Sequence, residues 1–210
     1  MANPPDDDTV ALAAAWNGDA AAFAEIFGRY RKRLKLMVKL RLDRRLSGRV
    51  DAEDVLQEAF LEAFRKLPQY RENQQLPLFL WLRLVVGEKL IDLHRHHLGA
   101  QMRDAGREVS LNRSAMPAIS SVALAAQLMG SITSPSLAAV RAETKLQIQA
   151  ALDLMDPLDR EVLTLRNFEL LSNSETAEVL GISQQAASNR YVRALKRMKE
   201  LLSLIRPDQG

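Results

Sequence analysis

A row of amide and basic side chains near the end of the chain has the residue types and spacing to bind DNA. Its members are Gln184, Gln185, Ser188, Asn189, Arg190, Arg193, Lys196 and Arg197. Gln and Asn can bond bidentately to the edge of adenine, whereas Arg and Lys suit phosphates. We therefore expect the first turns of a helix to read bases and its later turns to hold the DNA backbone.

The same stretch has one apolar face at spacings of three and four, formed by Ala187, Tyr191, Ala194, Leu195, Met198, Leu201 and Leu202. A capping box from Ser172 to Glu175 predicts a preceding short helix that ends at Leu180. Gly181 can end that helix in the left-handed conformation, and Ser183 can cap the next one. Two helices joined by such a turn are typical of a DNA-binding helix-turn-helix. A solvated basic helix is the alternative.

An acidic helix is predicted in the first half of the chain, where Asp51 caps a run with buried positions at helical spacing from Val55 to Leu67. The polar residues that lie away from this apolar stripe include Asp51, Asp54, Gln57 and Glu58. An acidic face does not bind DNA, so it indicates either a basic protein partner or plain solubility.

The elements that position these residues give an all-α pattern of two small helical domains. Helical spacing of apolar residues covers 10–98, with four or five helices, and returns over 137–205. Gly18, Ser47-Gly48, Pro68 and Pro77 are the main expected interruptions of the first stretch. Asp156-Pro157 predicts a helix start there, with Asp159 near the positive end of the helix dipole. Residues 1–9 are expected to be disordered, and 99–136 to form a flexible linker with one short helix near Val122 to Met129.

Composition sets further limits. The 210 residues are 47% hydrophobic and 26% charged, as in ordinary globular proteins. A net charge of +3 with unevenly placed basic residues favours a polyanionic partner. The absence of cysteine excludes disulfides and thiolate metal sites and fits a cytoplasmic location. No secretory signal is expected, and the longest apolar run is about half of the roughly 20 residues that span a bilayer, so no membrane segment is expected.

Two motifs resemble the extracytoplasmic-function (ECF) family of bacterial RNA polymerase sigma factors. The string DAEDVLQEAFLEAFRKL, which begins at Asp51, resembles the polymerase-binding segment of that family. The string LSNSETAEVLGISQQAASNRYVRALKRMKELL, which begins at Leu171, resembles the promoter-reading helix-turn-helix. Trp16-Asn17-Gly18-Asp19 and Trp81 also agree in order and spacing, and the resemblance covers most of 10–98 and 137–203.

The resemblance implies a non-catalytic subunit without a cofactor, built from sigma region 2 in 10–98 and sigma region 4 in 137–205. Asp51, Asp54, Gln57 and Glu58 would dock on the clamp coiled coil of core polymerase, while region 4 would meet the flap and read the minus-thirty-five element. Gln69 to Pro77 would hold a flipped base of the minus-ten element. The side chains implied for the melted strand are Tyr70, Asn73, Trp81, Lys89, Arg95 and His96.

The partners implied are therefore core RNA polymerase and promoter DNA, both double- and single-stranded, with an anti-sigma factor as a further candidate. Glu88 stands where relatives often have Asn, so the resemblance does not fix the minus-ten sequence. The basic stretch 29–49 could add phosphate contacts or be a solvated helix face, and both readings stay open.

Two other classes of function are weighed against this one. A stand-alone helix-turn-helix repressor or activator would explain 137–205 but would leave the acidic helix unused. An enzyme would need a site, for which the best case is a metal held by His94, His96 and His97, with Asp92 as the only nearby acid. The sequence therefore does not indicate a metal site.

Overall fold

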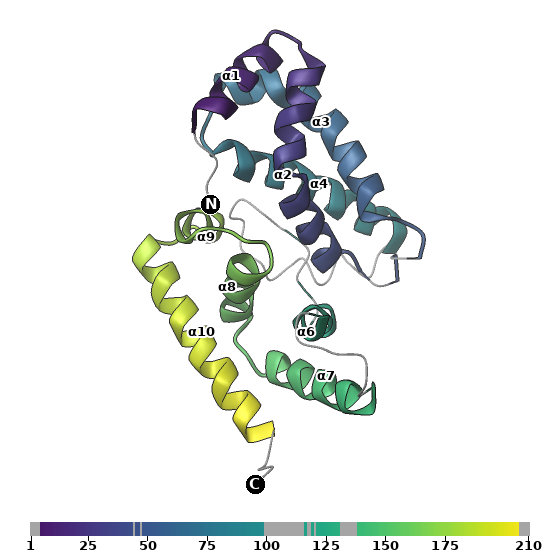
Figure 1. The fold of residues 1–210 in the computed structure, drawn as a ribbon, viewed down its shortest axis with the longest axis vertical. Helices are drawn as coiled ribbons and strands as arrows, with labels where there is room; N and C mark the ends of the chain where they lie inside the picture. Colours follow the sequence, from purple (N-terminus) through teal and green to yellow (C-terminus); the bar gives the residue numbers. More distant parts are fainter. Residues whose placement is uncertain are drawn as a thin grey trace. The chain divides into compact units, whose positions relative to one another are not determined.

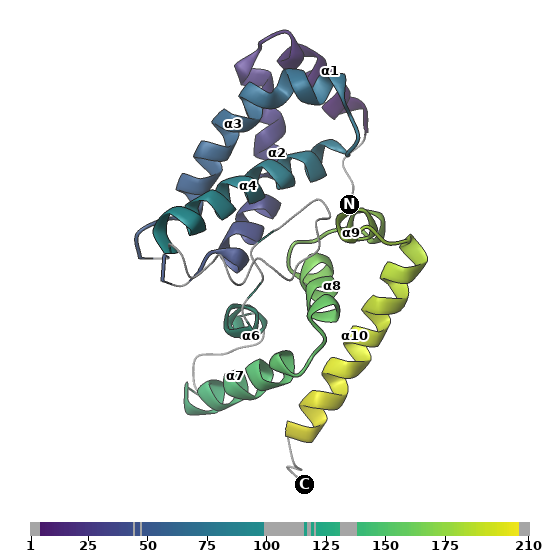
Figure 2. The ribbon, with the colours of Figure 1, turned by 180° about the vertical axis from the view of Figure 1, so that it is seen from behind.

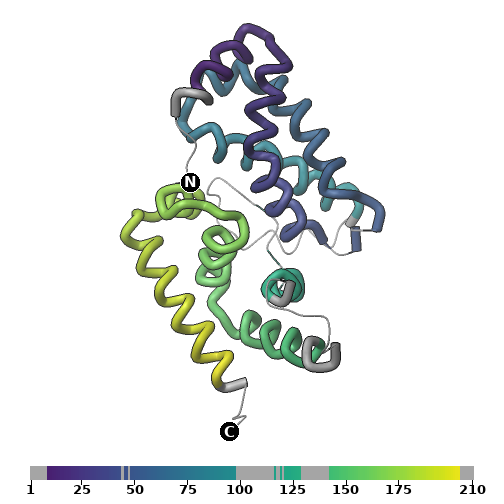
Figure 3. Tube along the Cα trace, in the orientation of Figure 1, coloured from purple at the N-terminus to yellow at the C-terminus, as the bar shows by residue number. Residues whose placement is uncertain are grey.

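In the part of the chain that it describes, the computed structural model contains helices joined by turns and loops, and no strands (Figure 3). The described residues are 5–43, 45–46, 48–98, 116, 119, 121–130 and 138–205. They fall into two compact units, Met1–Pro117 and Ala118–Gly210, which are considered separately below. The predicted all-α class with two helical domains is confirmed.

The first unit is a bundle whose helices are α1 (Pro5–Trp16), α2 (Ala20–Arg41), α3 (Ala52–Glu72) and α4 (Leu78–Leu98). Figures 1 and 2, which view the chain from opposite sides, show α2, α3 and α4 packed against one another. Asp19 begins α2 by accepting the N–H groups of Ala21 and Ala22, and Asp51 occupies the cap position of α3. Local capping therefore sets where the two central helices begin.

An aromatic cluster forms the centre of this bundle. Phe23 of α2 is fully buried, and its ring centroid lies 5.2 Å from that of Phe60 and 5.5 Å from that of Phe64 on α3. Phe27 meets Phe60 edge-on at 5.3 Å. Such tilted and edge-to-face contacts are favourable geometries for aromatic pairs, so the cluster fixes how α2 lies on α3.

Basic residues of 29–49 take part in this packing. Arg31 and Lys35 on α2 both form ion pairs with Glu53 on α3. The guanidinium of Arg33 lies 3.5 Å from the centroid of the Phe79 ring, and Arg41 is buried. Much of the positive charge in this stretch therefore holds the bundle together, although exposed cations such as Lys32 and Lys39 also occur.

Two features of the first unit differ from expectation. Residues 5–9 belong to α1 although 1–9 was expected to be disordered; Pro5 stands at the first helical position, where a missing N–H is tolerated. Pro68, expected to interrupt a helix, lies inside α3, which continues to Glu72. The last turn survives the lost hydrogen bond because Tyr70 is buried and anchors it.

The second unit has five helices among its described residues: α6 (Ser121–Gly130), α7 (Ala138–Asp153), α8 (Pro157–Asn167), α9 (Asn173–Leu180) and α10 (Gln184–Ile205). The predicted short helix near Val122 to Met129 is α6, which packs on α7. Arg160 of α8 donates to Ser121 Oγ at 2.7 Å. Hence α6, placed in the linker by the sequence reading, belongs to the second unit, and most of 99–120 lies outside the described residues.

The predicted boundaries of the helix-turn-helix are confirmed. Ser172 and Glu175 form the capping box, with each side chain accepting the backbone N–H of the other residue. Gly181 ends α9 at φ 64°, and Ser183 Oγ accepts the N–H of Ala186 at 3.1 Å. Leu170, before α9, also has a positive φ of 59°, which costs a non-glycine residue about 1–2 kcal/mol.

His94, near the end of α4, contacts the segment that follows α2. Its side chain is buried, and its Nε2 accepts the backbone N–H of Asp43 at 3.2 Å. Burial lowers the pKa of His94 below its ordinary value of 6.5, against the opposing attraction of the Asp43 carboxylate. The folded state therefore requires a neutral imidazole whose Nε2 carries no proton.

We predict that the first unit loses stability as pH falls from about 6.5 through the lowered pKa of His94. The group binds protons more readily in the unfolded chain, and each unit of pKa difference corresponds to about 1.4 kcal/mol. Denaturant unfolding followed by tryptophan fluorescence measures this, since both tryptophans, Trp16 and Trp81, lie in the first unit. His94→Gln should flatten the pH dependence relative to the His96→Gln control; equal slopes in the two variants would contradict the assignment.

Candidate nucleic-acid interface and acidic surface

The leading end of α10 presents the four predicted base-reading residues, all exposed: Gln184, Gln185, Ser188 and Asn189. Gln185 and Asn189 lie one turn apart, and Gln185 Nε2 donates to Asn189 Oδ1 at 3.1 Å. This bond orients both amides on the same outward side of the helix. The spacing allows the two side chains to meet neighbouring base pairs in a major groove.

Polar contacts within the second unit hold this end of α10 in place. Asn173 Nδ2 at the start of α9 donates to the carbonyl of Gln184 at 2.9 Å. Further along, the Tyr191 hydroxyl donates to Asn167 Oδ1 of α8 at 2.9 Å. Contacts from α9 and from α8 therefore hold α10 in place, which limits its sliding and rotation.

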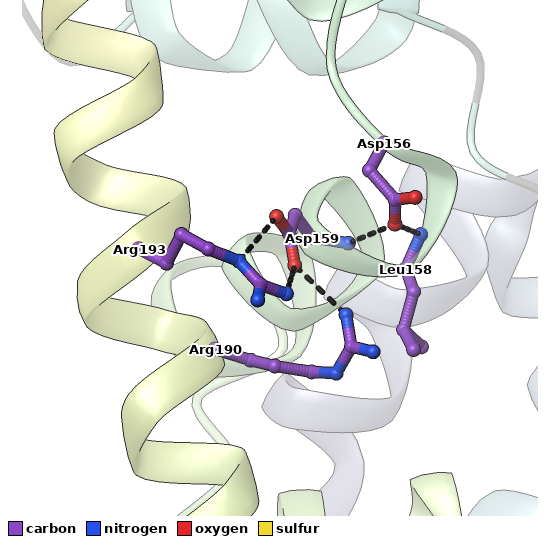
Figure 4. Close-up of polar contacts among 5 residues, drawn as sticks. All are labelled: Asp156, Leu158, Asp159, Arg190 and Arg193. Atoms are coloured by element: carbon purple, nitrogen blue, oxygen red, sulfur yellow. Dashed lines mark hydrogen bonds and ion pairs between the residues drawn. The ribbon is translucent and has the colours of Figure 1, made fainter.

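Asp159 on α8 binds two of the four cations that were predicted to contact phosphate (Figure 4). Arg190 Nη1 lies 3.1 Å from Asp159 Oδ1. Arg193 makes two contacts, from Nη2 to Oδ1 at 3.0 Å and from Nε to Oδ2 at 3.2 Å. Asp159 itself is buried and was read from the sequence only as a helix-dipole residue. No local pattern predicts that these side chains, which are more than thirty residues apart, would meet.

The other two cations point outward. Lys196 is exposed, and Arg197 lies 3.5 Å from Glu200 in a solvent-accessible pair that contributes little stability. Leu195, which was assigned to the apolar face, is 44% exposed, and Val192 is also exposed. The buried stripe is narrower than expected because it is centred on Ala187, Ala194 and Leu201, and Leu195 lies beside it.

The predicted acidic surface lies at the start of α3. Its four residues are all exposed: Asp51, Asp54, Gln57 and Glu58. Val55, Leu56 and Ala59 between them are buried. Asp54 Oδ2 accepts the N–H of Asp51 at 3.1 Å, so one oxygen of this carboxylate is held close to the helix start. The structure thus brings the four side chains together on one side of α3, away from the core.

Three of the residues implied for the melted strand gather between α3 and α4. The rings of Tyr70 and Trp81 stack with centroids 4.5 Å apart at an interplanar angle of 24°. Tyr70 is only 6% exposed and donates its hydroxyl to the carbonyl of Leu76 at 3.0 Å, and burial raises its pKa. Asn73, exposed, caps the end of α3. Tyr70 therefore fixes both the loop after α3 and one face of the half-buried Trp81.

Lys89, Arg95 and His96 lie further along α4, with Lys89 half-buried and the other two exposed. Lys89 is eight residues beyond Trp81, which is about 12 Å along a helix. Sequence reasoning missed the ion pair between Lys66 Nζ and Glu88 Oε2, at 2.9 Å, which joins α3 to α4. The hydrogen bond to Glu88 raises the pKa of Lys66, and Glu62 adds to the effect.

The histidines do not converge on a metal. His94 is buried against Asp43, whereas His96 and His97 are exposed with their rings edge-on at 5.0 Å. Within the described residues, no group of three His, Cys, Asp or Glu is arranged to hold an ion. Nor does any helix there combine the length and apolar character needed to cross a membrane.

The geometry defines a two-domain helical protein whose second domain carries a helix-turn-helix with an exposed recognition helix. Two family models match the chain: Sigma-70 region 2 over residues 26–98 and Sigma-70, region 4 over residues 145–198. Together they cover the acidic helix α3, all of α4 and most of α10. The chain belongs to the sigma-70 family of RNA polymerase sigma factors, in its ECF group.

Relatives agree with this assignment over nearly the whole chain. The ECF RNA polymerase sigma factor SigD of Mycobacterium tuberculosis is 27% identical over 92% of this chain and 82% of its own length. The RNA polymerase sigma factor CnrH of Cupriavidus metallidurans is 26% identical over 95% of this chain and 96% of its own. The solved structure of CnrH in complex with the cytosolic domain of CnrY covers 95% of this chain and 99% of that one, with 21% identity and a TM-score of 0.55, which supports the shared fold.

Proposed function

We propose that this chain, as a sigma factor, divides promoter recognition between its two domains in the way that their surface charges suggest. The first domain docks on the clamp coiled coil of core polymerase and holds the melted minus-ten element. The second domain meets the flap and reads the minus-thirty-five element as duplex. The observation that carries the proposal is the occurrence of both surfaces in one chain: an exposed acidic helix face on α3 and an exposed amide row on α10.

The acidic surface suits a basic protein partner because its charges are exposed and, beyond capping the start of α3, are not used to join helices. Glu53, the acid of the same helix turn that does support the fold, pairs with Arg31 and Lys35. Asp51, Asp54 and Glu58 have no such cross-helix ion pair among the described contacts. Charge complementarity between such a surface and its partner affects which partner binds and how fast the two associate.

For the melted strand we propose two different roles. Trp81 contacts a base, and Tyr70 holds the Trp81 ring in position. Tyr70 is buried and hydrogen bonded, so its role is to hold the loop before α4 and to support the Trp81 ring from behind. Trp81 keeps an accessible portion, and Asn73 is exposed at the end of α3. An indole and an amide suit a flipped base, while Lys89, Arg95 and His96 suit the following phosphates.

A stand-alone repressor or activator is not favoured, because region 2 of the sigma-70 family covers most of α2 together with all of α3 and α4. We further propose that the chain is a non-catalytic subunit that works in the cytoplasm, where core polymerase is found. An anti-sigma factor is a proposed further partner, since the similar protein CnrH has been solved in complex with the cytosolic domain of CnrY.

We expect the double substitution Asp54→Lys and Glu58→Lys to abolish binding to core polymerase while leaving the fold intact. Both side chains are exposed, and their neighbours Val55 and Ala59, which stay unchanged, form the buried stripe. Affinity for core polymerase and helicity by circular dichroism are the two measurements. Glu72→Lys, exposed at the other end of α3, is the matched control. Unchanged affinity in the double variant would remove this surface from the mechanism.

In the second domain, Gln185→Ala or Asn189→Ala should relax sequence preference at one or two positions of the minus-thirty-five element, at a cost of about 1–3 kcal/mol there. Lys196→Ala should instead weaken all promoters alike and reduce the slope of log affinity against log salt by about one unit. Salt titrations of each holoenzyme on matched and mismatched promoters separate the two effects. If Lys196→Ala altered preference and the amide substitutions did not, the orientation of α10 in the groove would be wrong.

A further inference from the structure

Asp159 is a buried carboxylate shared by two arginines of very different exposure. The relative exposure of the side chains is 8% for Asp159, 31% for Arg190 and 60% for Arg193. Asp156 caps α8 by accepting the N–H groups of Leu158 and Asp159, and it adds a weaker attraction on Arg193 (Figure 4). One site therefore combines an inner pair, made with Arg190, and an outer pair, made with Arg193.

The two pairs differ in how easily they can be broken. A buried carboxylate that lost all its partners would be strongly destabilised, whereas an exposed ion pair contributes little. Arg193 can leave Asp159 at small cost as long as Arg190 stays, because the carboxylate then keeps one charged donor. Departure of Arg190 would be more costly because its guanidinium is the more buried of the two.

Arg193 also lies where DNA phosphates are expected. It is one helical turn beyond Asn189 on α10 and is followed by the exposed cations Lys196 and Arg197. A duplex whose base edges meet Gln185 and Asn189 brings its backbone to the next turns of the same helix. The Asp159 carboxylate and a DNA phosphate then compete for the guanidinium of Arg193, because its paired N–H donors can bond to either anion.

We propose that Asp159 is a positioning residue that holds Arg193 in the free protein and releases it to a DNA phosphate on binding, while Arg190 remains in place. This inference rests on the proposed function, since it assigns a regulator to the same DNA surface. Asp159 thereby lowers the affinity of the free domain for any duplex, because each binding event must first break the outer pair. Sequence-independent binding is restrained, and the guanidinium is kept oriented beside the groove.

A double-mutant cycle between Asp159→Asn and Arg193→Gln tests the exchange. The full chain, without polymerase, is titrated with a random-sequence DNA duplex over a range of low salt concentrations. We expect Asp159→Asn to raise affinity about two- to fivefold, the size of an exposed ion pair. Arg193→Gln should lower the slope of log affinity against log salt by about 0.9, the value for one phosphate contact. In the Arg193→Gln background, Asp159→Asn should have no effect on affinity.

Other outcomes overturn the proposal. If Asp159→Asn raises affinity equally in both backgrounds, the effect is one of overall charge and not of release. If Arg193→Gln leaves the salt slope unchanged, Arg193 stays on Asp159 in the complex and the pair is only a structural anchor. Should Asp159→Asn unfold the second domain, as judged by circular dichroism, the salt slope of Arg193→Gln still decides, because that side chain is exposed. Since polymerase is absent from the assay, failure here and failure of the sigma function are separate results.

Discussion

The rotation of α10 about its own axis decides which of its side chains are exposed, and the contact of Arg190 with Asp159 helps to set it. The buried stripe of α10 is narrow and centred on two alanines and a leucine, Ala187, Ala194 and Leu201. Small side chains leave rotation weakly determined, since they interdigitate little with the helices beneath. Two contacts with α8, from Arg190 to the carboxylate of Asp159 and from Tyr191 to the amide oxygen of Asn167, add directional constraints on which residues face outward. Gln185 and Asn189 face solvent as a result.

A similar separation of charges organises the first domain. Cations that lie between helices are neutralised there, as Arg31 and Lys35 are by Glu53 and Lys66 is by Glu88. The acids at the start of α3 are left exposed. The folded chain thus uses part of its charge for packing and presents the rest as two surfaces of opposite sign, one on each domain. The net charge of +3 does not show this division, because the opposite charges nearly cancel in the sum.

Features encoded locally were predicted from the sequence, and contacts between distant residues were not. The capping box at Ser172, the left-handed Gly181 and the Ser183 cap depend on three or four neighbouring residues, so their pattern alone defines them. The contact of Asp159 with Arg193 joins residues that only the packing of α8 on α10 brings together. Pro68 was read as a break because a helix interior disfavours proline, yet the buried Tyr70 anchors the turn that follows. Exposure of the acidic and amide rows followed from periodicity, while their roles with partners remain predictions.

Transcription by purified core polymerase on a library of genomic fragments, with and without this protein, followed by mapping of the start sites, tests directly whether the chain works as a sigma factor. We expect discrete new start sites that appear only when the protein is added, preceded by shared sequences at the minus-ten and minus-thirty-five positions. We also expect the protein alone to bind those fragments weakly at physiological salt. Tight, sequence-specific binding by the protein alone, with no new transcripts in the presence of core polymerase, would contradict this role.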